Sequence, residues 1–266
     1  MPIRSGFGAP ALPRVNWNSS DAALAQRALH APRIPWDKFT NEYFQWENGE
    51  HVGLIGQTGL GKTTLLINLL PLHRFVTVFA TKPRDNVMQA LIDTHGYLKM
   101  AKWQSLDPNE FPRRVLWPDA SRMKSQEKQR EVFDDAMEKI YREGGWTLAL
   151  DETWYMENVL NLGANVRTFL LQARSLGISL ICATQRPAWV SREIYTASTH
   201  LFFWRVNDET DLKSISGIGW LSSNIIRDVV ANLDVHQVLY INTRTGDMVR
   251  TRCPEIRIES GRRKNK

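Results

Sequence analysis

The chain has 266 residues and is 42% hydrophobic, enough for one large α/β domain with short appendages. Its 34 lysines and arginines against 28 acidic residues give a formal charge of +6, a moderate basic excess that suits a polyanionic partner without proving one. The sequence shows neither a span of ~20 apolar residues nor the apolar segment of a secretory signal, which argues against membrane and secreted proteins and favours a cytoplasmic one.

The two cysteines, Cys182 and Cys253, lie far apart, which argues against a disulfide framework and against a cysteine zinc site. We expect Cys182 to pack inside a strand.

Residues 1–35 combine five prolines with small and basic residues, and only Ser20–His30 has helical spacing. We therefore expect a Pro-rich arm over residues 1–35, a compact domain over residues 36–255 and a short basic tail over residues 256–266.

Apolar, β-rich runs alternate with segments of helical spacing through the compact domain. The expected strands are Glu50–Ile55, Phe75–Ala80, Arg114–Trp117, Trp146–Leu150, Ile178–Thr184, Leu201–Val206 and His236–Asn242. The expected helices are Thr64–Leu70, Gln126–Arg142 and Asn165–Ser175, and a last hairpin turns at Thr245-Gly246-Asp247. This alternation predicts an α/β fold with a mainly parallel central sheet flanked by helices.

A phosphate-binding loop follows the first expected strand and precedes the first expected helix. It fits the pattern GxxxxGK[ST] at every constrained position, and chance would produce such a match on the order of once in a hundred chains of this length. The residues expected to bind the nucleotide are Gly56, Gln57, Thr58, Gly59, Leu60, Gly61, Lys62, Thr63 and Thr64. Backbone N–H groups of such a loop and the helix N-terminus converge on an anion.

Two side chains of this loop have more specific expected roles. Lys62 would contact the β- and γ-phosphates of ATP, and the Thr63 hydroxyl would ligate Mg²⁺. The alternative is a glycine-rich turn whose lysine is simply solvated.

Three polar residues follow two later strands of the expected sheet, where ligands of parallel sheets gather. Asp151 would hold Mg²⁺ and Glu152 would orient or deprotonate the attacking water. Their alternative role is to complement a helix dipole. Gln185 would sense the γ-phosphate or the water, unless it only caps its strand.

Three motifs in this order resemble those of the HerA and FtsK superfamily of DNA-pumping ATPases. They are GQTGLGKTT at Gly56–Thr64, LALDE at Leu148–Glu152 and QARSLGISLICATQRP at Gln172–Pro187. The last block is the most specific of the three. The resemblance covers about Trp46 to Arg192 and is weak beyond Thr199.

This resemblance implies a RecA-like ATPase domain over residues 36–255 and a homo-oligomeric ring, a hexamer or pentamer. ATP hydrolysis between subunits would drive double-stranded DNA through the central pore. Arg174 matches the family's trans-acting arginine, which would complete the catalytic set of Lys62, Glu152 and Gln185. Arg186 and Arg192 are rival candidates, and any of the three arginines could instead be a surface charge or a helix cap.

The chain looks close to the minimal motor, without the membrane anchor or DNA-orienting domain of larger relatives. Such compactness resembles the packaging ATPases of some tailed phages and related small virus-encoded members of the family. We therefore expect a viral or plasmid origin, with a portal or other DNA-handling protein as a further partner. Candidate DNA-contacting loops are Lys82–Asn86, Lys99–Lys102 and Arg122–Arg130. The mixed charges of the last segment suit a solvated helical face equally well.

Four tryptophans could stack on bases in a reader of single strands, but core or interface packing is the more usual role. They are Trp103, Trp117, Trp154 and Trp189.

Other functions compatible with the phosphate loop are a HerA-like helicase or DNA-transfer ATPase, a small-molecule kinase and a nucleotide-switched assembly factor. The Asp151-Glu152 pair and the Gln185 strand ending favour hydrolysis over both of the last two.

Overall fold

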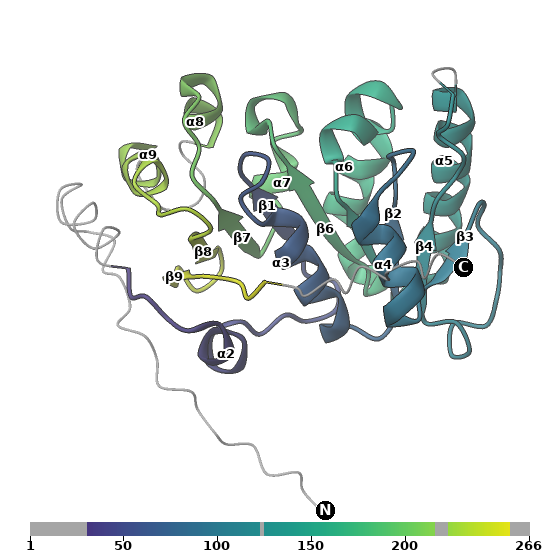
Figure 1. Cartoon of the computed structure of the whole chain (residues 1–266), viewed down its shortest axis with the longest axis horizontal. Helices are drawn as coiled ribbons and strands as arrows, with labels where there is room; N and C mark the ends of the chain where they lie inside the picture. The colour runs from purple at the N-terminus through teal and green to yellow at the C-terminus, as the bar shows by residue number, and fades with distance from the viewer. Residues whose placement is uncertain (1–30, 123–124, 216–222, 256–266) are drawn as a thin grey trace, which may run out of the picture.

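The computed structural model describes residues 31–122, 125–215 and 223–255. Within them, one sheet has the strand order β3-β4-β2-β5-β6-β1-β7-β8-β9, and Figure 1 shows helices along both of its faces. The pairs from β3 to β7 are parallel, and β8 and β9 add an antiparallel extension. The predicted helix Ser20–His30 and basic tail lie outside the described residues.

All seven predicted strands are present, each within two or three residues of the expected ends. The observed strands are β1 Val52–Ile55, β2 Val76–Phe79, β3 Leu98–Met100, β4 Arg113–Leu116, β5 Thr147–Leu150, β6 Ser179–Thr184, β7 His200–Phe203, β8 Val238–Asn242 and β9 Met248–Thr251. The predicted hairpin joins β8 to β9. Cys182 is buried in β6, as expected.

All three predicted helices are present. Their observed ends differ by one or two residues, or their last turn is a separate 3₁₀ turn. The observed helices are α2 Trp36–Lys38, α3 Lys62–Leu69, α4 Asn86–His95, α5 Gln126–Glu143, α6 Gly163–Gln172, α7 Glu193–Thr196, α8 Glu209–Ile215 and α9 Ser223–Ala231. Short 3₁₀ or π turns continue several of them: η1 Phe39–Tyr43, η2 Leu70–Leu72, η4 Tyr155–Val159, η5 Ala173–Leu176 and η6 Pro187–Trp189. Pro71 ends the first predicted helix by converting its last turn to 3₁₀ geometry.

Side chains of the central strands point alternately to the two faces of the sheet and pack into a hydrophobic core on each face. On one face, strand residues such as Val78 and Ala149 pack against α3 and α4 and against Phe39 of η1. On the other face, Leu148 and Leu180 pack against α5 and α6, while β7 and β8 pack against α8 and α9. Burial on both faces explains why the sequence shows near-continuous apolar runs rather than alternation in these strands.

Of the two expected loops between residues 80 and 102, Lys82–Asn86 is a loop up to Asp85, and only Asn86 belongs to a helix. Helix α4 begins at an Asp85 cap, whose carboxylate accepts the N–H groups of Val87 and Met88. Lys99 lies in edge strand β3, and its ammonium group stacks 4.4 Å from the Trp117 ring. The expected loop Lys99–Lys102 is therefore partly a strand. With only 3 residues, β3 is too short to show a strand pattern in the sequence.

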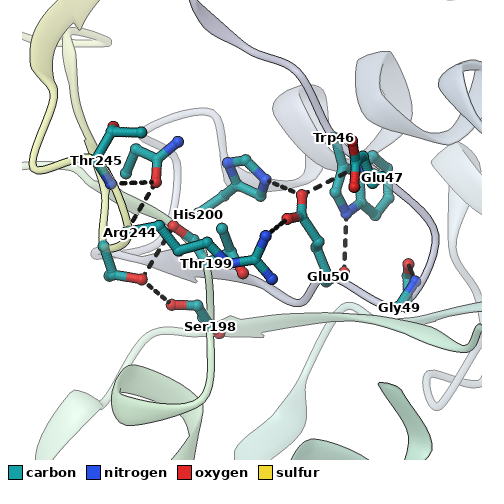
Figure 2. A network of polar contacts seen from close by, with 12 residues as sticks. Trp46, Glu47, Gly49, Glu50, Ser198, Thr199, His200, Arg244 and Thr245 are labelled. Carbon is teal, nitrogen blue, oxygen red and sulfur yellow. Dashed lines mark hydrogen bonds and ion pairs between the residues drawn. The ribbon is translucent and has the colours of Figure 1, made fainter. Parts of the chain in front are cut away.

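A buried polar network ties the two ends of the domain together at the amino edge of the sheet (Figure 2). Glu50, two residues before β1, accepts a 2.9 Å hydrogen bond from His200 at the start of β7 and pairs with Arg244 in the β8–β9 turn. The other ring nitrogen of His200 lies 2.8 Å from the Tyr240 hydroxyl. Because the Glu50 side chain is only 6% exposed, these partners replace nearly all of its hydration.

The environment of Glu50 makes the protein sensitive to acid. Burial raises the pKa of Glu50, but hydrogen bonds from His200 and the Glu47 backbone and the charges of His200 and Arg244 outweigh it and lower the pKa to about 2. The carboxylate therefore stabilises the folded state above its unfolded pKa of about 4.5, and this contribution is lost as the pH falls toward 2.

We predict that Glu50→Gln lowers the free energy of unfolding by roughly 3 kcal/mol at pH 7, because an ion-paired buried carboxylate is lost. The difference from the unmodified chain should shrink between pH 5 and pH 2. Denaturant unfolding at several pH values measures it. Glu42→Gln is the control, since Glu42 is half exposed in a surface pair with Lys38. A difference that stays constant with pH would contradict the prediction.

Candidate active site

The phosphate loop connects β1 to α3 at the carboxyl edge of the sheet. Gly61, the residue before α3, has a φ of 107°, a conformation that disfavours any side chain. Gly56 is required for a different reason, because a Cβ there would lie 2.6 Å from the Cβ of Trp204, which follows β7. The loop therefore combines a turn for anion binding with close packing against a neighbouring strand end.

Lys62 is held inside this loop. Its ammonium group donates to the carbonyl oxygens of Gly56 at 2.6 Å and Gln57 at 2.8 Å, and the residue is 7% exposed. Burial lowers the pKa of Lys62 to about 8, although the charges of Glu152 and Asp151 act in the opposite direction. A buried, preplaced ammonium group is well suited to bind phosphate oxygens, which would supply the missing negative charge.

Asp151, directly after β5, faces the phosphate loop. Its Oδ1 accepts a 2.9 Å hydrogen bond from the Thr63 hydroxyl, so the two residues predicted to hold the metal lie together. Its Oδ2 pairs at 3.1 Å with the ammonium group of Lys82, a residue that we expected in a DNA-contacting loop. Lys82 also lies 3.4 Å from Asp85, and although burial alone would lower the Lys82 pKa, the two carboxylates raise it.

Glu152 and Gln185 form a second hydrogen-bonded group at the same edge of the sheet. The Gln185 amide nitrogen donates to Glu152 at 2.7 Å, and its carbonyl oxygen accepts a hydrogen bond from the Thr58 hydroxyl. One side chain thus links the phosphate loop to the acid. Burial and the neighbouring Asp151 charge raise the pKa of Glu152, while Lys62, Lys82 and the Gln185 amide oppose them. A carboxylate with a raised pKa is suited to accept a proton from water.

Sheet order explains why these residues meet. β2, β5, β6 and β1 are neighbours, with Leu150 beside Cys182 and Thr184 beside Ile55 in the parallel register. Each site residue follows the carboxyl end of one of these strands. Parallel pairing therefore brings four sequence-distant segments to one edge.

A cavity of about 420 Å³ lies over the loop and is large enough for phosphate groups and a metal ion. Among the described residues, no group of three or more His, Cys, Asp or Glu side chains could hold a metal alone. The Thr63 hydroxyl and Asp151 fit Mg²⁺, which takes few ligands from protein and the remainder from phosphates and water.

Several lining residues of this cavity come from the end of the chain, which the sequence motifs did not indicate. They are Trp204, His236, Arg252, Cys253 and Glu255. His236 has a left-handed backbone with φ of 61°, and its Nδ1 lies 3.3 Å from the Leu60 carbonyl. Trp204 falls inside the predicted strand Leu201–Val206 and follows β7 only because that strand ends at Phe203. The others depend on the antiparallel strands that return the chain to the phosphate loop.

The segment after Gln185 is anchored by a buried acid on α8. Asp211, 4% exposed, accepts the Ala188 backbone N–H at 3.1 Å and pairs with Arg186 at 3.4 Å. Arg186 therefore has an intramolecular partner, which weakens its case as the trans-acting arginine. Asp211 indirectly positions Gln185, another role that the sequence did not indicate.

Arg174 and Arg192 do not join the site within one chain. Arg174 lies in η5 before the amino end of β6, against Gly49 and thus at the sheet edge opposite the phosphate loop. Its side chain is exposed, and so is that of Arg192 before α7. Six strand residues at about 3.3 Å each separate Arg174 from Gln185 by roughly 20 Å.

The tryptophans that were candidate stacking residues divide by burial. Trp103 and Trp117 are buried in the two cores, as the core-packing alternative predicts. Trp189 is 58% exposed, and Trp154 is partly exposed. Among the described residues, no helix is long and apolar enough to cross a membrane.

Comparison with known proteins finds a similarity of structure alone. No protein-family model matches the chain, and no curated protein matches its sequence. The genome-packaging NTPase B204 of Sulfolobus turreted icosahedral virus 2, in complex with sulfate, has a TM-score of 0.56 and 16% identity, covering 78% of this chain and 97% of that one. The DNA-packaging ATPase of Sulfolobus turreted icosahedral virus has a TM-score of 0.56 and 17% identity, covering 79% and 100%.

VirB4 of Thermoanaerobacter pseudethanolicus has a TM-score of 0.58 and 11% identity, covering 79% of this chain and 90% of that one. The viral NTPase has also been solved with ATP-γS and with AMPPCP. At these identities the likeness establishes a shared fold. The predicted α/β phosphate-loop ATPase fold is thus confirmed, as is the resemblance to packaging-type ATPases in respect of that fold.

The Lys62 environment predicts a pH dependence of nucleotide binding. The free ammonium group loses its proton near pH 8, whereas bound phosphates would keep it charged, so binding above pH 8 requires proton uptake. We expect affinity for a fluorescent, non-hydrolysable ATP analogue to fall by up to about tenfold per pH unit between pH 8 and 10. Lys62→Met should bind weakly with no such slope. An affinity that is constant across this range would contradict the prediction.

Proposed function

We propose that the protein is an ATP-hydrolysing motor that moves double-stranded DNA, of the genome-packaging type, and acts as a homo-oligomeric ring. The observation that carries this proposal is the Thr58–Gln185–Glu152 connection, which joins a phosphate loop to a carboxylate placed for water activation. A phosphate-binding scaffold or a pure nucleotide switch does not need that connection.

Each site residue has a role in this proposal. Lys62 and the loop N–H groups bind the triphosphate, while Thr63 and Asp151 hold Mg²⁺, which would neutralise phosphate charge. Glu152 accepts a proton from the attacking water, and Gln185 orients both Glu152 and the water. Arg174, supplied by the neighbouring subunit, neutralises charge that develops on the γ-phosphate.

Support for DNA as the cargo comes from the fold and from charge. Two solved neighbours are described as packaging enzymes, one for genomes and one for DNA. The net charge of +6 favours a polyanionic partner. A pentameric or hexameric ring, a viral origin and a portal partner are further parts of the proposal.

A second cavity favours one other function. A cavity of about 500 Å³ beside Glu152 and Gln185 has aromatic walls formed by Trp154, Tyr155 and Trp189. A planar acceptor bound there would make the protein a small-molecule kinase. The two functions differ in their product, because a hydrolase releases inorganic phosphate from ATP without any added acceptor.

We predict phosphate release from ATP that is stimulated by double-stranded DNA and lost in Lys62→Ala. Glu152→Gln should bind ATP normally but hydrolyse it about 100-fold more slowly or worse, because the proton acceptor is removed. Single-turnover phosphate release measures this effect. Glu131→Gln, an exposed change on α5, is the matched control. Unchanged turnover in Glu152→Gln would refute its catalytic role, and DNA-independent turnover would refute the motor.

The position of Arg174 predicts that it acts across a subunit interface. Subunits carrying Arg174→Ala, mixed with active subunits, should inhibit ATP hydrolysis by more than their share, because each one disables its neighbour's site. Arg142→Ala provides the control, since Arg142 is an exposed residue paired within its own helix. Activity that falls only in proportion to dilution would exclude a trans-acting role.

A further inference from the structure

Lys82 lies where a second cation could contact a bound triphosphate. It follows β2, which pairs with β5, so the lysine lies beside Asp151 and lines the nucleotide cavity together with the phosphate loop. Its ammonium group pairs with Asp151 at 3.1 Å and with Asp85 at 3.4 Å. Lys82 lies outside the sequence motifs that indicate nucleotide binding.

The backbone at Lys82 is fixed by side chains from other elements. The Lys82 carbonyl accepts a 2.8 Å hydrogen bond from the indole of Trp117, and the preceding Thr81 carbonyl accepts one at 2.9 Å from Gln129. Gln129 is 1% exposed and in turn accepts the Tyr155 hydroxyl. The position of residue 82 is therefore built into the fold, while its side chain, 49% exposed, keeps room to move.

The charges at this position imply an exchange of partners. Thr63 donates to one oxygen of Asp151, and Lys82 pairs with the other. A divalent ion held by Thr63 and Asp151 would repel the ammonium group, since both cations would share one carboxylate. The triphosphate that arrives with the ion brings the nearest new negative charge. Lys62 is held at the phosphate loop, whereas Lys82 lines the same cavity beside Asp151.

We propose that Lys82 is a second phosphate-binding cation, which pairs with Asp151 in the nucleotide-free protein and transfers to the terminal phosphate when Mg²⁺ and ATP bind. This inference rests on the proposed function in assuming that the site binds ATP. We assign Lys82 to the γ-phosphate side because of the strand order. β6 separates β2 and β5 from β1, the strand that enters the phosphate loop. Lys82 thus distinguishes ATP from ADP.

The test measures binding rather than turnover. In Lys82→Met, affinity for a fluorescent non-hydrolysable ATP analogue with Mg²⁺ should fall about 10- to 100-fold, as expected when a charged hydrogen bond is removed. Affinity for fluorescent ADP should change less than about threefold, because ADP lacks the phosphate in question. Lys82→Arg should retain most of the preference for the ATP analogue. Lys139→Met, a surface change in a helical pair, is the matched control.

Three results would overturn the inference. Equal weakening of ATP-analogue and ADP binding would make Lys82 a structural partner of Asp151. Unchanged nucleotide affinities with weaker DNA binding would make it a DNA contact. Failure of the unmodified chain to bind either nucleotide would remove both this inference and the proposed function. Selective loss of ATP-analogue binding in a protein that does not respond to DNA would retain the inference and refute the motor.

Discussion

The contact between Thr63 and Asp151 is the point on which the rest of the site depends, because it fixes the distance between the phosphate loop and the acidic strand end. These residues are 88 positions apart and lie on opposite sides of β6, yet their oxygens are 2.9 Å apart. β6 completes the arrangement by placing Gln185 at the same edge, where it bonds to Thr58 of the loop and to Glu152. A change in sheet order would separate these groups by at least one strand spacing, about 4.8 Å, and a register shift of one residue would move them by about 3.3 Å along the strands.

The two edges of the sheet have different chemistry. The carboxyl edge carries polar groups whose interactions are incomplete without a ligand, including an ammonium group bound to loop carbonyls and a carboxylate with a raised pKa. The amino edge carries Glu50, His200 and Arg244, which satisfy one another and join the first strand to the last hairpin. We interpret the amino edge as a structural clamp that holds the antiparallel strands in place, and these strands in turn place Arg252 and His236 at the nucleotide cavity.

The loop after β6 connects the catalytic region to the remainder of the chain. Asp211 on α8 holds its backbone, and Glu157 in η4 accepts hydrogen bonds from Ser191 at its far end. Both ends of the segment that carries Gln185 and Trp189 are therefore anchored. The exposed Trp189 and Gln185 therefore lie on one short segment that is held by hydrogen bonds to two other elements.

The sequence by itself determined the fold class, the identity of the phosphate loop and the strands other than the short edge strand β3, because apolar runs and glycine spacing are local properties. It also placed Asp151, Glu152 and Gln185 at strand ends, where a parallel sheet gathers ligands. Only the tertiary structure determined which side chains contact each of these polar residues. Lys82 and Asp211 carry no local signal, since a lysine after a strand or an acid on a short helix is usually solvated. Their roles come from strands and helices that meet only after folding, when strand order brings distant charges within a few ångströms.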